Sequence, residues 1–248
     1  MVEQRQPGPS RGMVRAAVVW DAVQDELGQL GGLGRVLDLG GGTGGFAVRV
    51  AGLGHHVTVV DPSPDALASL QRRAAESGVD TRIAGIQGDA TDLLDHLGSD
   101  SIDMVLCHGV LEVVDDPVQT LMVVREVLHQ HGALSLLVAH RPAAALARAL
   151  AGQVEAVRDL LLAPSTGSGS ATGPRRFTES ETLDLVRASG LVPTYVHGIR
   201  VFTDVVPGAL VDSEPRALET LLDCERLAAN RPELRALAGQ LHVGARRS

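Results

Sequence analysis

Arg35-Val-Leu-Asp-Leu-Gly-Gly-Gly-Thr-Gly-Gly-Phe46 is the stretch that decides the fold of this chain of 248 residues. Its apolar start predicts a buried strand, its glycines a tight turn, and the residues through Val50 a helix. Gly40, Gly42 and Gly44 allow a ligand to approach the backbone where a Cβ atom would collide. The N-terminus of the helix that follows presents free N–H groups, which favour an anion.

Strands and helices alternate on both sides of this turn. Apolar runs predict further strands at 57–60, 83–87, 102–107 and 133–139. Helices are expected at 13–30, 62–77 and 117–129. This alternation predicts an α/β fold with a doubly wound, mostly parallel sheet and right-handed crossovers.

The second half of the chain has a looser pattern. It predicts helices at 142–162, 178–188 and 215–229, a strand at 191–202 interrupted at Gly198, and a last strand at 240–245. Thr178 and Glu181 have the spacing of a capping box. We expect a single domain over 1–248, with a loose N-terminus at 1–12, an insertion or lid at 141–176, and a helical insertion at 205–239. The lid would contain the Gly/Ser/Thr-rich stretch 165–173.

Composition restricts the compartment and the partners. All 22 basic residues are arginine, and 30 acids give a net charge of −8, so contact with nucleic acid would need a local arginine surface. Cys107 and Cys224 are too few for a disulfide framework or a zinc module. Without an apolar run of about 20 residues or a signal peptide, we expect a cytoplasmic protein with no membrane partner. Adjacent His55 and His56 would face opposite sides of a strand, so we expect no metal site.

Three acids near the glycine turn favour one class of ligand. Asp38 puts a carboxylate under the turn, which suits an ammonium group and clashes with a pyrophosphate. Asp61, at the end of the strand 57–60, can accept both hydroxyl hydrogens of a ribose. Asp89, followed by Ala90, can accept from the amino group of an adenine. Together these residues favour S-adenosylmethionine, held also by the glycines Gly40, Gly41, Gly42 and Gly44.

Two other interpretations of the turn stay open on these residues. Gly40, Gly42 and Gly45 also satisfy the G-x-G-x-x-G fingerprint of dinucleotide-binding proteins, a motif that is weak by itself. A glycine turn in an α/β protein that binds no ligand is the second.

Five motifs in order resemble those of the class I S-adenosylmethionine-dependent methyltransferases. They are LDLGGGTGG at 37–45, VTVVDPSPDAL at 57–67, GDATDL at 88–93, IDMVLCHGVLEVVDDP at 102–117 and HGALSLLVAH at 131–140. The resemblance covers 35–139. It implies a seven-stranded sheet in which the last strand, here 240–245, inserts antiparallel.

Further matches, which lie partly outside this core, resemble a narrower family, the bacterial tRNA 5-carboxymethoxyuridine methyltransferases. They are Arg11-Gly-x-x-Arg15 with Trp20, CHGVLE at 107–112, GALSL at 132–136, GIRVF at 198–202 with Asp204, and QLHV at 240–243. Those enzymes esterify the carboxylate of a modified wobble uridine, so the resemblance implies tRNA as the partner. The chain departs from the family at Arg11, commonly Lys, at Val113, commonly a bulky aromatic residue, and at His140, commonly a small polar residue.

A carboxylate acceptor is ionised at neutral pH, so it needs a cationic clamp rather than a general base. The resemblance implies Arg200 as this clamp. It also implies that Arg15 reaches the methionine carboxylate of the cofactor and that His108 lies against the cofactor.

Other acceptors and roles stay open. A small-molecule O- or N-methyltransferase of secondary metabolism would use His108 or His140 as its base. A subunit that binds the cofactor without catalysis is a third interpretation. Arg175 and Arg176 are candidates for contact with a phosphate, or else a solvated pair.

Overall fold

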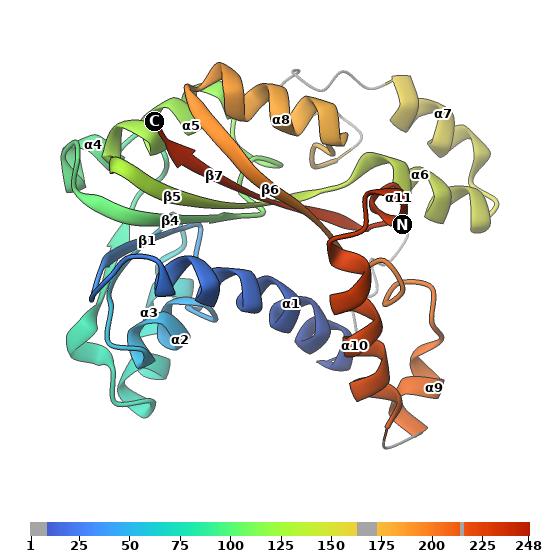
Figure 1. The fold of residues 1–248 in the computed structure, drawn as a ribbon, viewed down its shortest axis with the longest axis horizontal. Helices are drawn as coiled ribbons and strands as arrows, with labels where there is room; N and C mark the ends of the chain where they lie inside the picture. The colour runs from blue at the N-terminus through green and yellow to red at the C-terminus, as the bar shows by residue number, and fades with distance from the viewer. Residues whose placement is uncertain (1–8, 163–172, 214–215) are drawn as a thin grey trace.

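The computed structural model describes residues 9–162, 173–213 and 216–248. Within them, seven strands form one sheet in the order β3-β2-β1-β4-β5-β7-β6 (Figure 1). The strands are β1 (Arg35–Leu39), β2 (His56–Asp61), β3 (Ile83–Gln87), β4 (Ile102–His108), β5 (Leu128–Ala139), β6 (Leu191–Ile199) and β7 (Gln240–Arg247). The pairs among β1 to β5 are parallel, whereas β7 is antiparallel to both β5 and β6. The predicted α/β fold and its antiparallel last strand are confirmed.

Helices cover both faces of the sheet. On one side lie α1 (Pro9–Gly28), α2 (Ala47–Gly52) and α3 (Pro64–Glu76), and on the other α4 (Leu93–Leu97), α5 (Pro117–Val127) and α8 (Glu179–Ala188) (Figure 1). Two cores result, one on each face, and alternate residues of β4 enter them: Met104 and Leu106 the first, Val105 and Cys107 the second. Burial on both faces explains why the strands are continuous apolar runs in the sequence.

Local signals fix several helix starts. The Ser63 hydroxyl accepts the N–H of Ala66 at 3.2 Å, ahead of α3. The capping box before α8 is confirmed: Thr178 Oγ1 accepts the N–H of Glu181 at 3.3 Å, and the Glu181 carboxylate accepts the N–H of Thr178 at 2.8 Å. Such caps satisfy N–H groups that have no partner inside the helix.

Two predicted elements in the second half of the chain differ from the structure. The helix expected at 142–162 is two helices, α6 (Arg141–Leu150) and α7 (Val154–Leu162), because Gly152 turns the chain with φ of +74°. The strand expected at 191–202 ends at Ile199, and its irregularity lies at Pro193/Tyr195 rather than at Gly198. Proline explains this position, since it has no N–H for the ladder.

Toward the two ends of the chain, the observed helix boundaries differ from the predicted ones. Helix α1 begins at Pro9 rather than residue 13, and proline is suited to a first helical turn. Segment 205–239 contains α9 (Gly208–Ser213), α10 (Ala217–Ala229) and α11 (Pro232–Arg235). Most of the predicted loop 165–173 lies outside the described residues. Among the helices described, none has the length and apolarity needed to cross a membrane.

Candidate functional site

The glycine turn lies where β1 ends. Gly40, Gly42 and Gly44 have φ of +67°, +55° and +78°, a region that residues with a side chain rarely adopt. A Cβ atom added to Gly41 would come within 2.5 Å of the Asp38 carboxylate. The turn therefore requires glycine both for its backbone conformation and for its close packing on Asp38.

Asp38 is a buried acid, with 4% of its surface exposed. Burial, with a smaller contribution from the charge of Asp61, raises its pKa to about 7, against the effect of a hydrogen bond from the backbone of Ala47. None of the ion pairs between described residues includes Asp38. An ammonium group at the turn would favour the ionised form, so this acid fits the amino group of S-adenosylmethionine.

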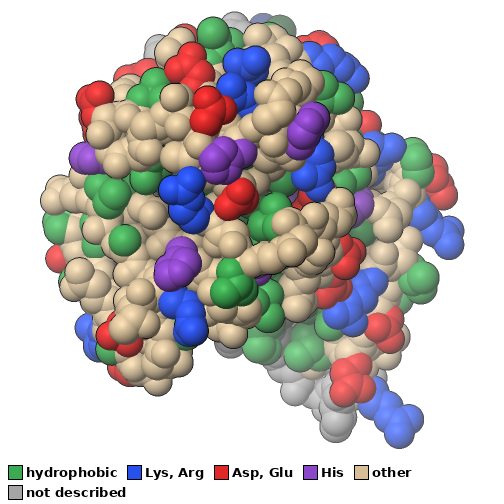
Figure 2. Space-filling model, turned by 60° about the vertical axis from the view of Figure 1, so that its left-hand side comes forward, with side chains coloured by type: hydrophobic (Ala, Val, Ile, Leu, Met, Phe, Trp, Pro, Cys, Tyr) green, Lys and Arg blue, Asp and Glu red, His purple; other side chains and the backbone are tan. Residues whose placement is uncertain are grey.

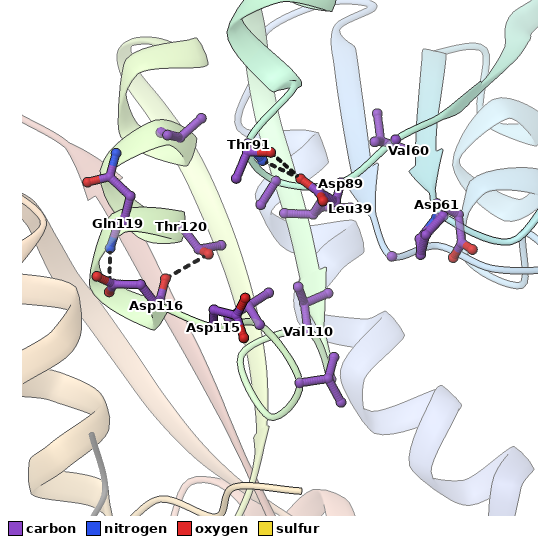
Figure 3. Close-up of a pocket in the computed structure, with 18 residues that line it drawn as sticks. Leu39, Val60, Asp61, Asp89, Thr91, Val110, Asp115, Asp116, Gln119 and Thr120 are labelled. Atoms are coloured by element: carbon purple, nitrogen blue, oxygen red, sulfur yellow. Dashed lines mark hydrogen bonds between the residues drawn. The ribbon is translucent and has the colours of Figure 1, made fainter. Parts of the chain in front are cut away.

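Asp61 and Asp89 follow the neighbouring strands β2 and β3. Asp61 Oδ2 accepts the N–H of Gly42 at 2.9 Å and Oδ1 accepts the N–H of Ser63 at 2.9 Å, which directs the carboxylate toward the turn. Each oxygen keeps a lone pair for a ribose hydroxyl. Asp89 Oδ1 accepts from the N–H and hydroxyl of Thr91 at 2.7 and 2.6 Å, and these bonds lower its pKa (Figure 3).

A cavity of about 610 Å³ opens in front of these acids (Figure 3). Its apolar walls include Leu39, Val60 and Val110, and Asp61 and Asp89 contribute carboxylates. Ala90 also lines it. An apolar slot with a few carboxylates suits a nucleoside, whose base packs while its hydroxyl and amino groups donate.

His108, at the end of β4, belongs to a hydrogen-bonded chain that enters the sheet. Its Nε2 lies 2.8 Å from Ser135 Oγ, which lies 2.7 Å from Nε2 of the buried His242. The ring of Phe46 packs edge-on against His108 with 5.0 Å between centroids. Burial, together with the charge of Arg15, lowers the pKa of His108 to about 3. The imidazole is therefore neutral at physiological pH.

Arg200 follows β6 in a strained conformation, with φ of +62°. Its Nε and Nη2 donate to the Asp204 carboxylate, at 3.0 Å for Nε and at 2.7 and 2.6 Å for Nη2. The loop is held from α10, where Glu225 accepts the N–H groups of residues 201, 202 and 203 at 2.9, 2.9 and 2.7 Å. A Cβ atom on Gly239 would come within 2.7 Å of Asp204.

Arg15 and Glu112 lie beside this clamp. Burial and then the charge of Arg200 lower the pKa of Arg15, whereas Glu112 opposes that shift. Glu112 is buried, and its Oε1 accepts the N–H of Ala139 at 2.7 Å. Its Oε2 has no hydrogen-bond partner among the described residues, and burial raises its pKa.

The sequence-predicted residues form two groups on one edge of the sheet. Gly40, Asp61, Asp89 and Ala90 line the cavity, and Asp38 lies next to Gly41 of the glycine turn. Arg15 interacts electrostatically with both His108 and Arg200, which connects these three residues. Their roles toward a ligand remain predictions.

Several other functional candidates have a structural position. His140 is buried, and its Nδ1 lies 2.9 Å from the carbonyl of Ala238. Arg175 is buried as well, and its guanidinium donates to the carbonyls of Val114 and Asp115. Cys107 is fully buried, which raises the pKa of its thiol far above the usual range.

Arg148 and Glu225 are residues that the sequence reasoning missed. Arg148 lies on α6, which matches no motif, and acts electrostatically on Arg176. Glu225 lies on α10, 25 positions after Arg200 in the sequence, where no local pattern reveals its contact. Among the described residues, no group of three or more His, Cys, Asp or Glu is placed to hold a metal ion.

Comparisons with known proteins agree with this geometry. Residues 36–132 match the methyltransferase domain family. The tRNA 5-carboxymethoxyuridine methyltransferase of Escherichia coli O157:H7 is 28% identical over 241 residues, which cover 97% of this chain and 90% of the relative. The ubiquinone biosynthesis O-methyltransferase of Xanthomonas axonopodis pv. citri is 33% identical, over 48% of each chain.

A solved structure shares the whole architecture. The S-adenosylmethionine-dependent methyltransferase of Mesorhizobium loti aligns with a TM-score of 0.61 at 25% identity, covering 94% of this chain and 100% of that one. The tRNA enzyme thus matches nearly the whole chain, whereas the ubiquinone enzyme matches about half of it.

Proposed function

This chain is an S-adenosylmethionine-dependent methyltransferase, and we propose that it esterifies the carboxylate of 5-carboxymethoxyuridine at the wobble position of tRNA. The enzyme class and the cofactor were predicted from the sequence and are confirmed. The acceptor is the proposal, and it is supported by a relative that matches the chain almost end to end. A tRNA acceptor would also place the enzyme in the cytoplasm.

When bound, S-adenosylmethionine supplies an electrophilic methyl group on a sulfonium. We assign its ammonium to Asp38, its ribose to Asp61, its adenine to Asp89 and Ala90, and its α-carboxylate to Arg15. The glycine turn provides the close backbone approach, since Gly41 has no room for a side chain above Asp38.

The clamp at Arg200 is the observation that carries the proposal. Asp204 occupies Nε and Nη2, while Nη1 has no partner among the described residues. The ion pair, the strained backbone and the contact with Gly239 hold the guanidinium in place. It can therefore bind an acceptor carboxylate and orient it in line with the methyl group, which is the main requirement of such a transfer.

The site is poorly equipped for a hydroxyl acceptor, which must lose a proton. His108 has a pKa of about 3, so it is too weak a base at neutral pH, and its Nε2 already bonds to Ser135. His140 is buried against Ala238. A carboxylate needs no base, so the neutral His108 and the fixed Arg200 favour it over a small-molecule alcohol.

Methyl transfer to defined tRNA tests the proposal. Purified protein is incubated with S-adenosylmethionine and tRNA that carries 5-carboxymethoxyuridine, and the nucleosides are analysed by mass spectrometry. We expect the methyl ester of the modified uridine, and none with tRNA that has unmodified uridine there. If calorimetry shows that S-adenosylmethionine binds, yet no ester forms, the tRNA assignment is wrong and small alcohols become the acceptors to test.

A further inference from the structure

Four arginines from separate parts of the chain interact electrostatically as one connected group, called here the arginine row. Arg15 comes from α1, Arg200 from the end of β6, Arg176 from the segment before α8, and Arg148 from α6. Electrostatic interactions connect Arg15 with Arg200, and Arg176 with both Arg200 and Arg148. The row therefore extends from the clamp outward to α6.

The backbone at Arg176 is firmly held. Arg141 donates to the Arg176 carbonyl with both Nε and Nη2, at 3.1 and 2.9 Å. On either side, the N–H of Arg175 bonds to the carbonyl of Glu112 at 3.0 Å, and the N–H of Phe177 bonds to the carbonyl of Ala139 at 2.9 Å. Arg176 is thus attached to the loop after β4 and to the end of β5, next to the clamp.

The guanidinium of Arg176 contrasts with this fixed backbone. Among the described residues it has no hydrogen bond and no ion pair, and the same holds for Arg148 and Arg15. Burial lowers the pKa of Arg176, and the charges of Arg148 and Arg200 act in the same direction. Glu112 is the acid that opposes them. Like charges held together in a partly buried place are costly unless an anion joins them.

The two carboxylates of the proposed ligands account for two of the four arginines and leave the other two without an anion. Arg200 is paired with Asp204 and is assigned to the acceptor carboxylate, and Arg15 is assigned to the carboxylate of the cofactor. Arg148 and Arg176 have neither role. A second anionic group on the acceptor would neutralise them, and the guanidinium fork matches the oxygens of a phosphate.

We propose that Arg148 and Arg176 form a subsite for a phosphodiester group of the acceptor, adjacent to the nucleoside whose carboxylate Arg200 holds. This inference rests on the proposed function and adds that the enzyme recognises a nucleotide chain rather than a free nucleoside or carboxylic acid. It also accounts for RNA binding by a protein of net charge −8, because the contact is confined to a short arginine row.

A set of matched acceptors tests this subsite. The full chain is assayed with 5-carboxymethoxyuridine as the nucleoside, as dinucleotides extended on either side through a phosphodiester, and as the same dinucleotides with a neutral methylphosphonate link. We expect kcat/KM to be about tenfold to a hundredfold higher for one charged dinucleotide than for its neutral counterpart. In Arg176→Ala and Arg148→Ala this ratio should fall toward one.

The controls separate charge from folding. Arg158→Ala, which removes an exposed arginine on the neighbouring helix α7, should keep the wild-type ratio. Arg176→Lys retains the positive charge but lacks the guanidinium fork, so it should keep part of the ratio between charged and neutral dinucleotides. A second measurement is independent of turnover: the affinity for an anticodon stem-loop with S-adenosylhomocysteine bound should depend less on salt in Arg176→Ala. The log–log slope should change by about 0.7 for each phosphate that the variant no longer binds.

The outcomes are distinguishable. Equal kcat/KM for charged and neutral links in the wild-type protein, or a ratio that survives in both alanine variants, overturns the phosphate subsite while leaving the carboxylate acceptor in place. Absence of ester with every acceptor, including the stem-loop, overturns the proposed function and the subsite together.

Discussion

Charged side chains differ in their bonding between the two ends of the parallel strands, which we call the two edges of the sheet. At the edge where β1 to β5 begin, two arginines are bonded to the fold: Nη1 of Arg247 lies 2.8 Å from the Asp100 carboxylate and also contacts the backbone carbonyls of residues 125, 126 and 128. Arg246 there bonds to Glu26, Gln29 and the carbonyl of His131. At the edge where those strands end, Asp38, Arg15 and Arg176 have no ion-pair partner among the described residues.

This difference distinguishes charges that are neutralised within the fold from charges that remain available to a ligand. The starting edge also has a cavity, of about 290 Å³, lined by Arg35, His56, Arg82 and His96 among others. Yet the N–H of Arg35 donates to Asp103, and its side chain contacts His129. On the face in Figure 2, which turns this edge toward the viewer, basic, acidic and histidine side chains are interspersed. The charged residues and histidines named at that cavity are exposed, so a cavity alone is a weaker sign of a ligand site than buried or half-buried charges that lack partners.

The largest effect is expected for Arg200→Ala, which removes the clamp. Loss of a fixed ion pair to the acceptor should lower kcat/KM for tRNA by about a thousandfold. The affinity for S-adenosylhomocysteine, measured by calorimetry, should stay within a few-fold of wild type. The exposed Arg187 provides a control, and its alanine variant should retain full activity. A normal kcat/KM in Arg200→Ala would remove the main support for a carboxylate acceptor.

Asp38→Asn should act on the cofactor instead. Without the carboxylate, affinity for S-adenosylhomocysteine should fall by about a hundredfold at pH 8. The pKa of Asp38 in the free protein is about 7, so wild-type affinity should rise with pH up to that value and then level off. Below it, the ammonium must displace a proton. Asp38→Asn should show no such rise, and a wild-type affinity that is flat between pH 5 and 8 would contradict the assignment.

Ser135→Ala should have an intermediate effect, because it interrupts the chain from His108 to His242. Two buried imidazole nitrogens are left without a partner, which costs about 1 to 3 kcal/mol in the free energy of unfolding. Cofactor affinity should decline by up to about tenfold as the His108 ring loses its orientation. Ser135→Thr keeps the hydroxyl and is the matched control. An unchanged free energy of unfolding together with an unchanged cofactor affinity would mean that the hydrogen bonds from His108 to His242 contribute neither to stability nor to cofactor binding.

Arg247→Ala should have the smallest effect on activity. It removes the contacts of this arginine with Asp100 and with backbone carbonyls at the edge where β1 to β5 begin, so the free energy of unfolding should fall by about 1 to 3 kcal/mol. Urea denaturation measures this loss, and kcat/KM should stay within a factor of two of wild type when assayed well below the melting temperature. A large kinetic loss with unchanged stability would show that the contrast between the two edges does not hold.

Local patterns in the sequence were sufficient for much of this molecule. The glycine turn and Asp89 follow recognisable strands, Asp38 and Asp61 lie near the ends of theirs, and parallel strands bring their ends to the same edge. The capping box at Thr178 is equally local. Wrong predictions arose where one residue changed the backbone: Gly152 splits a helix, and the positive φ of Arg200 ends β6.

Other site residues could not be found from the sequence. Glu225 holds the clamp loop from a helix that matches no motif, and Arg148 reaches Arg176 only because α6 folds back beside the end of β5. Arg175 and Arg176 are adjacent and chemically identical. In the structure, Arg175 supports the loop after β4, whereas Arg176 has a guanidinium without a partner among the described residues.

The sequence by itself determined the sheet, the cofactor class and the acids that we assign to the cofactor, because strand ends and glycine turns are encoded by neighbouring residues. Only the tertiary structure decided which arginines are available for an anion. That depends on whether a carboxylate or a carbonyl from a distant segment already neutralises each guanidinium, and this pairing is a property of the packed chain.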